Sequence, residues 1–135
     1  PLHALAFNAS IEAACLHRHG DDYYLFVNWG RCCAGTNSTY EIRVGRSRNI
    51  TGPYLDPDGV DLKTEGGAPF LGTTGPFIGP GHAGIVSAGG REWLSCHFYD
   101  GTRQGMPTLA LLPLQWKTNG WPEVDWPLAR PGATH

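Results

Sequence analysis

Charged residues are scarce in this sequence. Only 16% of the 135 residues are charged, the net charge is −2, and no stripe of basic residues occurs. Nucleic-acid binding is therefore not expected, because a basic patch is what attracts the phosphate backbone.

Long hydrophobic runs are also lacking. No apolar run approaches the roughly 18 residues that a membrane-spanning helix needs, so no membrane partner is expected. The chain opens on Pro1, without an initiator methionine or a recognisable signal peptide. We interpret this start as that of a fragment, a processed chain or a truncated chain.

Cysteine is sparse and its spacing is uninformative. Cys15, Cys32, Cys33 and Cys96 match neither a metal-ligand spacing nor the disulfide pattern of a small secreted domain. Adjacent cysteines rarely bond to each other, so we expect Cys32 and Cys33 to pack or to face a pocket.

Helical periodicity is almost absent, and short alternating runs dominate instead. The 19 Gly and 11 Pro are mixed with 15 aromatic residues along the chain, which favours many short strands over disorder. Between the expected strands, residues 72–81 form a Gly/Pro-rich loop, and Asn119-Gly120 has hairpin-turn chemistry. We expect strands over residues 11–17, 23–29, 39–45, 69–71, 82–87, 91–99 and 107–116.

Two segments share a pattern of a turn followed by an aromatic strand. They cover residues 21–26 and 89–94. Short antiparallel strands at this spacing fit a β-sandwich or propeller blades, and two similar four-stranded units would be two blades. The length fits one all-β domain.

Glu12 and His82 are the two candidate site residues with the clearest context. Glu12 has apolar neighbours in Ile11 and Ala13, and an apolar setting keeps a carboxylic acid protonated, as proton donation requires. The alternative is a solvated carboxylate at a strand end. His82 lies between glycines that permit close approach of an ion or water, and the alternative is a buried histidine bonded to backbone.

Trp29 and Cys33 are candidate substrate-binding residues, because both lie on the loop that follows the strongest expected strand. An aromatic face can stack on a sugar, although an aromatic at a strand end is more often part of the core.

An ordered set of motifs covers residues 11–122. They are Ile11-Glu12-Ala13, the strand at residues 23–27, Cys32-Cys33-Ala34-Gly35, Ser38-Thr39-Tyr40, Val44-Gly45-Arg46-Ser47, Thr51-Gly52-Pro53-Tyr54, Gly79-Pro80-Gly81-His82-Ala83-Gly84, His97-Phe98-Tyr99-Asp100, Pro107-Thr108-Leu109 and Pro113-Leu114-Gln115-Trp116. In this order they resemble glycoside hydrolase family 43, and within it the endo-1,5-α-L-arabinanases.

The resemblance implies a five-bladed β-propeller, with antiparallel blades and the active site at the mouth of a central channel. About two and a half C-terminal blades would lie in residues 1–126, with residues 127–135 as a flexible tail. It also implies secretion and the inverting hydrolysis of α-1,5-linked arabinan, with Glu12 as the general acid. His82 would hold one calcium ion through its ring and surrounding waters.

Two departures from the family pattern stand out. Ala14 replaces the usual proline after Glu-Ala, which does not touch the carboxylate. An inverting glycosidase also needs a second carboxylate to activate water, and no motif here matches one. All aspartates but Asp125 fall in or beside expected turns: Asp21, Asp22, Asp56, Asp58, Asp61 and Asp100.

We therefore carry two hypotheses. In the first, the chain is the C-terminal half of an arabinan-degrading glycosidase, active when a complementary N-terminal half supplies the missing aspartates. In the second, it is a non-catalytic carbohydrate-binding or assembly module that oligomerises to close the propeller, because exposed sheet edges and apolar faces are rarely left uncovered. An unrelated lectin-like β-sandwich would leave the motif order unexplained.

Overall fold

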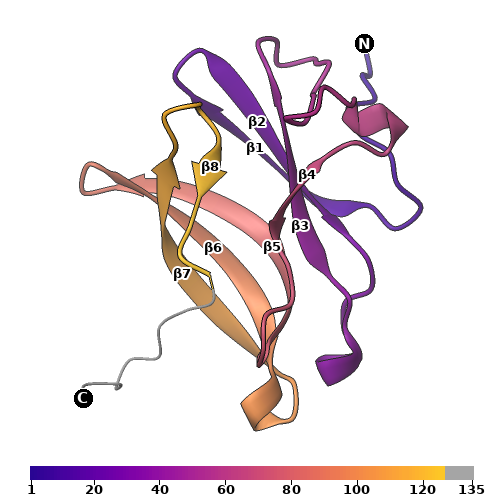
Figure 1. Ribbon diagram of the computed structural model, residues 1–135, viewed down its shortest axis with the longest axis vertical. Coiled ribbons are helices and arrows are strands. Elements are labelled where there is room, and N and C mark those ends of the chain that lie inside the picture. Colours follow the sequence, from indigo (N-terminus) through magenta and orange to yellow (C-terminus); the bar gives the residue numbers. More distant parts are fainter. Residues whose placement is uncertain (127–135) are drawn as a thin grey trace.

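The computed structural model describes residues 1–126, which form two four-stranded antiparallel sheets (Figure 1). We call the sheet β1-β2-β3-β4 the first blade and the sheet β5-β6-β7-β8 the second blade. Each sheet is a meander, in which neighbouring strands follow one another in sequence. This arrangement confirms the expected all-β architecture of antiparallel blades.

The first blade consists of β1 (Glu12–His19), β2 (Asp22–Trp29), β3 (Glu41–Ser47) and β4 (Ala68–Leu71). β2 is central and almost fully buried, as its aromatic and β-branched residues predict. The hairpin between β1 and β2 turns through Gly20, which takes a positive φ of 59°.

The second blade consists of β5 (Phe77–Ala88), β6 (Arg91–Asp100), β7 (Met106–Trp116) and β8 (Pro122–Glu123). Gly89 and Gly90 connect β5 and β6, and both have positive φ, as a tight hairpin turn requires. β2 and β6 thus occupy the same position in their blades, each after a tight turn. The recurrence seen in residues 21–26 and 89–94 has this structural basis.

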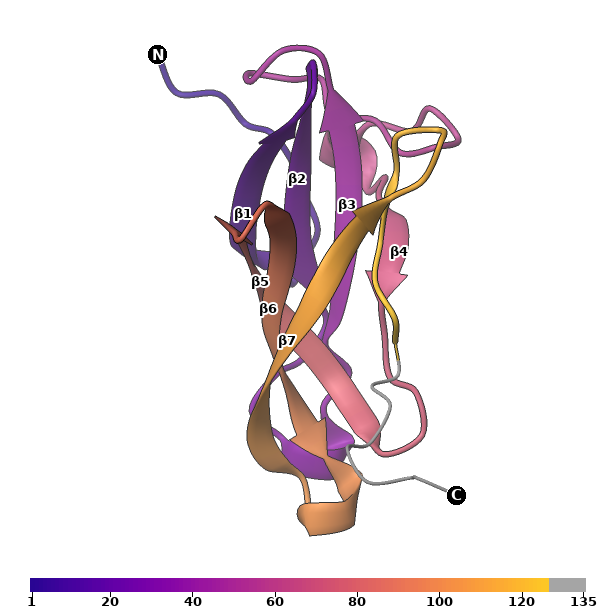
Figure 2. The same cartoon turned by 90° about the vertical axis from the view of Figure 1, so that its left-hand side faces the viewer.

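One core fills the space between the blades. The alternation of β2 sends Tyr24 and Phe26 into it, where they meet Leu94 and Phe98 of β6. Trp116, Trp121 and Trp126 pack around this core. Figure 2 shows the two sheets from the side, and β5 contacts β1, β2 and β3 across the interface.

A second, smaller core covers the other face of the first blade. Leu25 and Val27, the alternate residues of β2, pack there against Tyr54 and Leu62 from the connection between β3 and β4. Leu5 and Ile11 of the N-terminal segment add to it. Both faces of β2 are therefore buried, which explains its continuous apolar run.

β5 is the main departure from the expected elements. It begins at Phe77, although residues 77–81 were expected to be loop because they are rich in Gly and Pro. Irregular register between Ile78 and Gly84 absorbs these residues as bulges, so the strand continues through them. The expected strands 11–17 and 39–45 are instead Glu12–His19 and Glu41–Ser47, which are shifts of one or two residues at their ends.

Among residues 1–126, the helical segments are three short 3₁₀ turns, η1 (Gly35–Asn37), η2 (Leu62–Thr64) and η3 (Gly101–Arg103). Within residues 1–126 no helix has the length and apolar character to cross a bilayer. The expected tail at residues 127–135 lies outside the described residues.

Candidate active site

Glu12 begins β1 at a point where the register of the strand breaks. Glu12 is paired with Asn28, and the next paired residue is Cys15, so a bulge separates the two. Ala13 inside this bulge has a φ of 53°, unusual for a residue with a Cβ. A bulge re-aims the side chains beside it.

The carboxylate of Glu12 is exposed in this chain, and its Oε1 accepts a hydrogen bond from the hydroxyl of Tyr40. The enclosed apolar setting expected from Ile11 and Ala13 is therefore wrong for the chain by itself. Strand alternation is the reason, because neighbours along a strand point to opposite faces and do not surround a side chain between them.

Tyr40 is buried and lies directly before β3. Burial, followed by the hydrogen bond to Glu12 and the negative charge of its carboxylate, raises the pKa of the Tyr40 phenol well above its ordinary value. The phenol therefore keeps its proton and serves as a fixed donor that holds the carboxylate in one orientation.

His82 lies in the irregular part of β5 and has a φ of 60°. Its backbone N–H donates to Oδ1 of Asn28 at 2.8 Å. The Asn28 side chain is fully buried, and its Nδ2 donates to the carbonyl oxygens of Glu41 at 3.0 Å and Pro80 at 3.3 Å. One amide therefore ties the first blade to the second beside the candidate site.

His97 of β6 lies between His82 and Tyr40. Its ring centroid is 6.4 Å from that of His82 and 5.9 Å from that of Tyr40. Burial, followed by the charge of His82, lowers the pKa of His97 below its ordinary value. The ring is therefore neutral at pH 7 and can both donate and accept a hydrogen bond.

Cys33 joins the same group of residues through Tyr99. The backbone N–H of Cys33 donates to the Tyr99 hydroxyl at 2.6 Å, and the Tyr99 ring lies 5.5 Å from that of His97. The Cys33 side chain is exposed. We call this group the Tyr40 cluster; it consists of Glu12, Asn28, Cys33, Tyr40, His82, His97 and Tyr99.

Backbone strain gathers in or beside the Tyr40 cluster. Among residues 1–126, five non-glycine residues have positive φ. Glu65 and Gln104 are ordinary left-handed caps of η2 and η3. The other three are Ala13, Cys33 and His82. Such conformations persist where the surrounding structure enforces them, and they concentrate at functional sites.

Trp29 stands apart from this cluster. It packs with the second core beside Leu25 and Val27, and the guanidinium of Arg43 lies 4.6 Å from the centre of its ring. Its indole Nε1 is buried without a hydrogen-bond partner among the described residues. A sugar subsite at Trp29 stays a prediction, whereas Glu12, His82 and Cys33 are brought together.

Five of the described aspartates have contacts within their own turns or with Arg48. Asp56 accepts backbone N–H groups of its loop, and Asp61 and Asp100 cap η2 and η3. Asp21 and Asp22 face Arg48. None of these contacts leads to Glu12.

The groups around His82 do not match the ligands that calcium prefers. The imidazoles of His82 and His97 offer nitrogen, whereas Ca²⁺ takes six to eight oxygen ligands. Among the described residues, the grouping of three potential metal ligands lies elsewhere, at His17, His19 and Glu92. The two imidazoles therefore do not by themselves provide a calcium cage.

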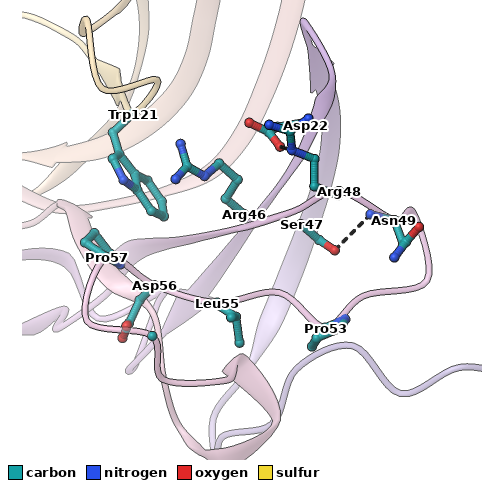
Figure 3. Close-up of a pocket in the computed structure, with 11 residues that line it drawn as sticks. Asp22, Arg46, Ser47, Arg48, Asn49, Pro53, Leu55, Asp56, Pro57 and Trp121 are labelled. Carbon is teal, nitrogen blue, oxygen red and sulfur yellow. Dashed lines mark hydrogen bonds and ion pairs between the residues drawn. The ribbon is translucent and has the colours of Figure 1, made fainter.

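Two hollows help to locate the site. One of about 310 Å³ adjoins Glu12 and is lined by Ile11, Ala13, Leu25 and Val27 among others. A larger one, of about 520 Å³, lies between Arg46, Arg48 and Trp121 and contains no residue of the Tyr40 cluster (Figure 3). We place the candidate site at Glu12, because the reactive side chains and not the size of a hollow define a catalytic site.

Sequence reasoning missed Asn28, Tyr40, His97 and Tyr99 as site residues. His97 and Tyr99 were detectable, because residues two apart on a strand face the same side. Asn28 and Tyr40 gave no such signal, since their roles depend on the packing of β5 against the first blade.

Comparison with known proteins identifies the family of the chain. The sequence model of Glycosyl hydrolases family 43 matches residues 6–122. An extracellular exo-α-(1→5)-L-arabinofuranosidase of Cellvibrio japonicus is 41% identical over 89% of this chain. An extracellular endo-α-(1→5)-L-arabinanase of Bacillus subtilis is 40% identical over 84% of it. The chain spans 35% and 34% of the lengths of these relatives.

Solved structures agree with the sequence relatives. The α-L-arabinanase of Cellvibrio cellulosa in complex with arabinohexaose superposes with a TM-score of 0.87 at 37% identity, over 91% of this chain and 43% of that one. An endo-arabinanase of Bacillus licheniformis gives a TM-score of 0.86 at 34% identity, with the same coverage. The family model spans residues 6–122, which include both blades and the ordered motifs. This chain therefore belongs to glycosyl hydrolase family 43 and is arabinanase-like.

Proposed function

We propose that this chain supplies the proton-donating part of an active site that hydrolyses α-1,5-linked arabinan with inversion. The observation that carries the proposal is the hydrogen bond between Tyr40 and Glu12, next to the strained backbone of Ala13 and His82. Family membership and the names of the relatives support the substrate class.

In this proposal, Glu12 in its protonated form donates its proton to the glycosidic oxygen as the bond to the anomeric carbon breaks. Tyr40 holds the carboxyl group toward the leaving oxygen. A second carboxylate, about 6.5–9.5 Å away in inverting enzymes, activates the water that attacks from the opposite face. We assign that carboxylate to family blades that these residues do not span.

The exposure of Glu12 fits this division of the site. Blades packed over the open side of the first blade would take the carboxyl group out of water, which favours the protonated form that a general acid needs. Arabinan, and the complementary blades or a second copy of the chain, are then the proposed partners. We also propose an extracellular location, since both curated relatives are named as extracellular.

For calcium, we propose only that His82 faces the channel centre. The other ligands would be water or groups of other blades, because Ca²⁺ prefers oxygen. Calcium titration of the complemented protein, with and without His82→Gln, tests this point.

The experiment for catalysis measures release of reducing ends from linear arabinan. It compares the chain alone, the chain mixed with the remaining blades of a family 43 arabinanase, and the same mixture with Glu12→Gln. We expect activity only in the mixture, with a loss of at least about 100-fold in the variant. Full activity of the Glu12→Gln mixture would overturn the proposal.

A second candidate function is a non-catalytic module that binds carbohydrate or assembles through its open face. The exposed side chains of Leu109 (86%) and Leu111 (59%) on β7 favour it, because such apolar patches mark interfaces. Arabinan binding by the chain, without hydrolysis in any mixture and unchanged in Glu12→Gln, would favour this reading over the catalytic one.

A further inference from the structure

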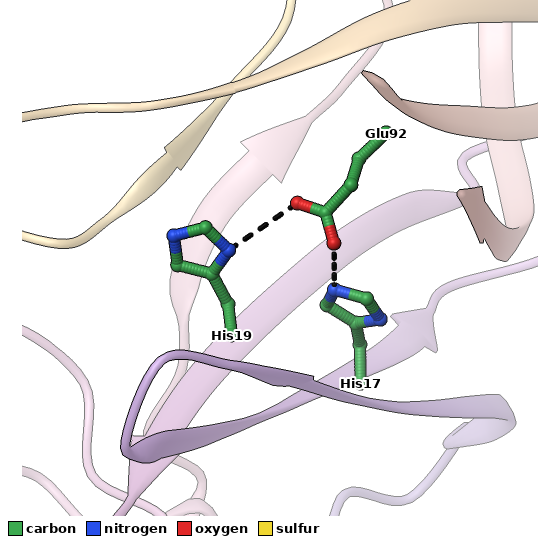
Figure 4. Close-up of side chains that lie close together, drawn as sticks. All are labelled: His17, His19 and Glu92. Carbon is green, nitrogen blue, oxygen red and sulfur yellow. Dashed lines mark hydrogen bonds and ion pairs between the residues drawn. The ribbon is translucent and has the colours of Figure 1, made fainter. Parts of the chain in front are cut away.

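A cluster of two histidines and one glutamate lies where the far end of the first blade meets the second. His17 and His19 come from β1, and Glu92 comes from β6 (Figure 4). Seven residue steps of strand separate Glu12 from His19, a distance of roughly 20 Å. This cluster is therefore a site separate from the Tyr40 cluster.

The ligand atoms of the three residues converge. Nε2 of His17 lies 2.7 Å from Oε1 of Glu92, and Nδ1 of His19 lies 3.3 Å from Oε2. All three ligand atoms fall within 4.8 Å of one another. Donors around one tetrahedral Zn²⁺, with bonds of about 2.0–2.2 Å, are about 3.4 Å apart, so small side-chain shifts bring these atoms to metal-binding spacing.

The local structure prepares the residues for this role. His17 and His19 are two apart on one strand, so both rings project from the same face. The ring of His19 stacks on Trp116, with centroids 3.8 Å apart, and the Trp116 indole N–H donates to Oε2 of Glu92 at 2.5 Å. Such outer contacts fix the orientation of ligands and are typical of metal sites.

The cluster is within reach of solvent. The side chain of His19 is 39% exposed, and a hollow of about 550 Å³ is lined by Glu92 and Trp116. An ion can therefore approach the group from solvent.

We propose that His17, His19 and Glu92 bind a divalent transition-metal ion of the Zn²⁺ type and that this ion locks the two blades together. Nε2 of His17, Nδ1 of His19 and one oxygen of Glu92 are the protein ligands, and water completes the tetrahedron. In the metal-bound form each ring binds through its unprotonated nitrogen and carries its one proton on the nitrogen that faces away from the metal. Two imidazoles and one carboxylate favour Zn²⁺ over the oxygen-seeking Ca²⁺.

The test is calorimetric titration of the metal-free full-length chain with Zn²⁺, paired with thermal unfolding. We expect one equivalent to bind and to raise Tm, since an ion that binds only the folded state stabilises it. His17→Gln, His19→Gln and Glu92→Gln should each weaken Zn²⁺ binding at least about tenfold. Ca²⁺ should produce no shift at this site.

Two controls separate this site from other histidines. His3→Gln changes an exposed residue of the N-terminal segment, and the pair His82→Gln with His97→Gln removes the rings of the Tyr40 cluster. Both controls should bind Zn²⁺ as the unmodified chain does.

Substitution of Co²⁺ gives a second readout, because its visible absorption reports a tetrahedral field. That absorption should be lost in His19→Gln. This variant therefore tests the site even if His17→Gln or Glu92→Gln folds poorly. Absence of Zn²⁺ binding, or binding that survives His17→Gln and His19→Gln but not the control pair, overturns the proposal.

Discussion

The hydroxyl of Tyr40 donates a hydrogen bond to Oε1 of Glu12 across 28 residues of sequence. Glu12 is the first residue of β1 and Tyr40 directly precedes β3, and β2 lies between these two strands in the sheet. The contact therefore exists only once three strands of the first blade have paired. Proton donation by Glu12 therefore depends on a folded sheet and not on a local motif.

The first prediction concerns this bond. Tyr40→Phe removes the donor and keeps the ring, so the blade should fold while the carboxyl group loses its fixed orientation. We expect kcat of the complemented enzyme on linear arabinan to fall about 10- to 100-fold with little change in KM, because only positioning is lost. Tyr54→Phe, in the second core, is the matched control and should leave kcat unchanged; an equal fall in both variants would contradict the positioning role.

Gly81 tests the close approach of β5 to the first blade. A Cβ at this position would lie 2.2 Å from Cδ2 of Tyr40 and 2.8 Å from Nδ2 of Asn28. We expect Gly81→Ala to lower the free energy of unfolding by about 1–3 kcal/mol in urea denaturation. Gly72→Ala, whose Cβ would meet nothing within 4 Å, should change it by less than about 0.5 kcal/mol. Equal stability of the two variants would contradict this packing.

Asn28 should be sensitive because its side chain is buried and makes three hydrogen bonds. Asn28→Ala leaves the N–H of His82 and the carbonyl oxygens of Glu41 and Pro80 without this partner. The expected cost is about 1–3 kcal/mol or more, measured as a lower urea midpoint. Asn49→Ala, on an exposed turn, should lie within about 0.5 kcal/mol of the unmodified chain.

Stability at acid pH should depend on Glu92. Its pKa in the folded chain is lowered, so the unfolded state binds the proton more tightly than the folded state does. The contribution is fully present above the ordinary glutamate value of 4.5 and is lost as pH falls through the lower, folded value. Glu92→Gln should therefore flatten this acid decline in unfolding measurements made with a chelator present. Glu123→Gln, at an exposed position, should leave it unchanged.

The outer face of β7 should control assembly more than folding. Because Leu109 and Leu111 are exposed there, Leu109→Ser combined with Leu111→Ser should change stability by no more than about 1 kcal/mol. The same change should weaken self-association or binding of the missing blades at least about tenfold, as followed by light scattering. Ile50→Ser, exposed in a turn, is the control; equal association of both variants would show that another face makes the contact.

Much of the blade architecture was predictable from local patterns. In β2, aromatic and β-branched residues indicate a central strand, and Gly89-Gly90 indicates the turn before β6. β5 was not predictable over residues 77–81, because bulges that accommodate Gly and Pro in a strand depend on pairing with β6. The candidate acid was found from its motif, whereas its partner Tyr40 was not.

By itself, the sequence determined most of the strand residues, the positions of the hairpin turns and the family to which the motifs belong, since these depend on alternation and on backbone preferences of neighbouring residues. Only the tertiary structure decided that Glu12 meets Tyr40, that Asn28 joins the blades beside His82, and that His17 and His19 meet Glu92. These contacts join residues far apart in the chain, and their geometry follows from strand register and from the packing of one sheet on the other.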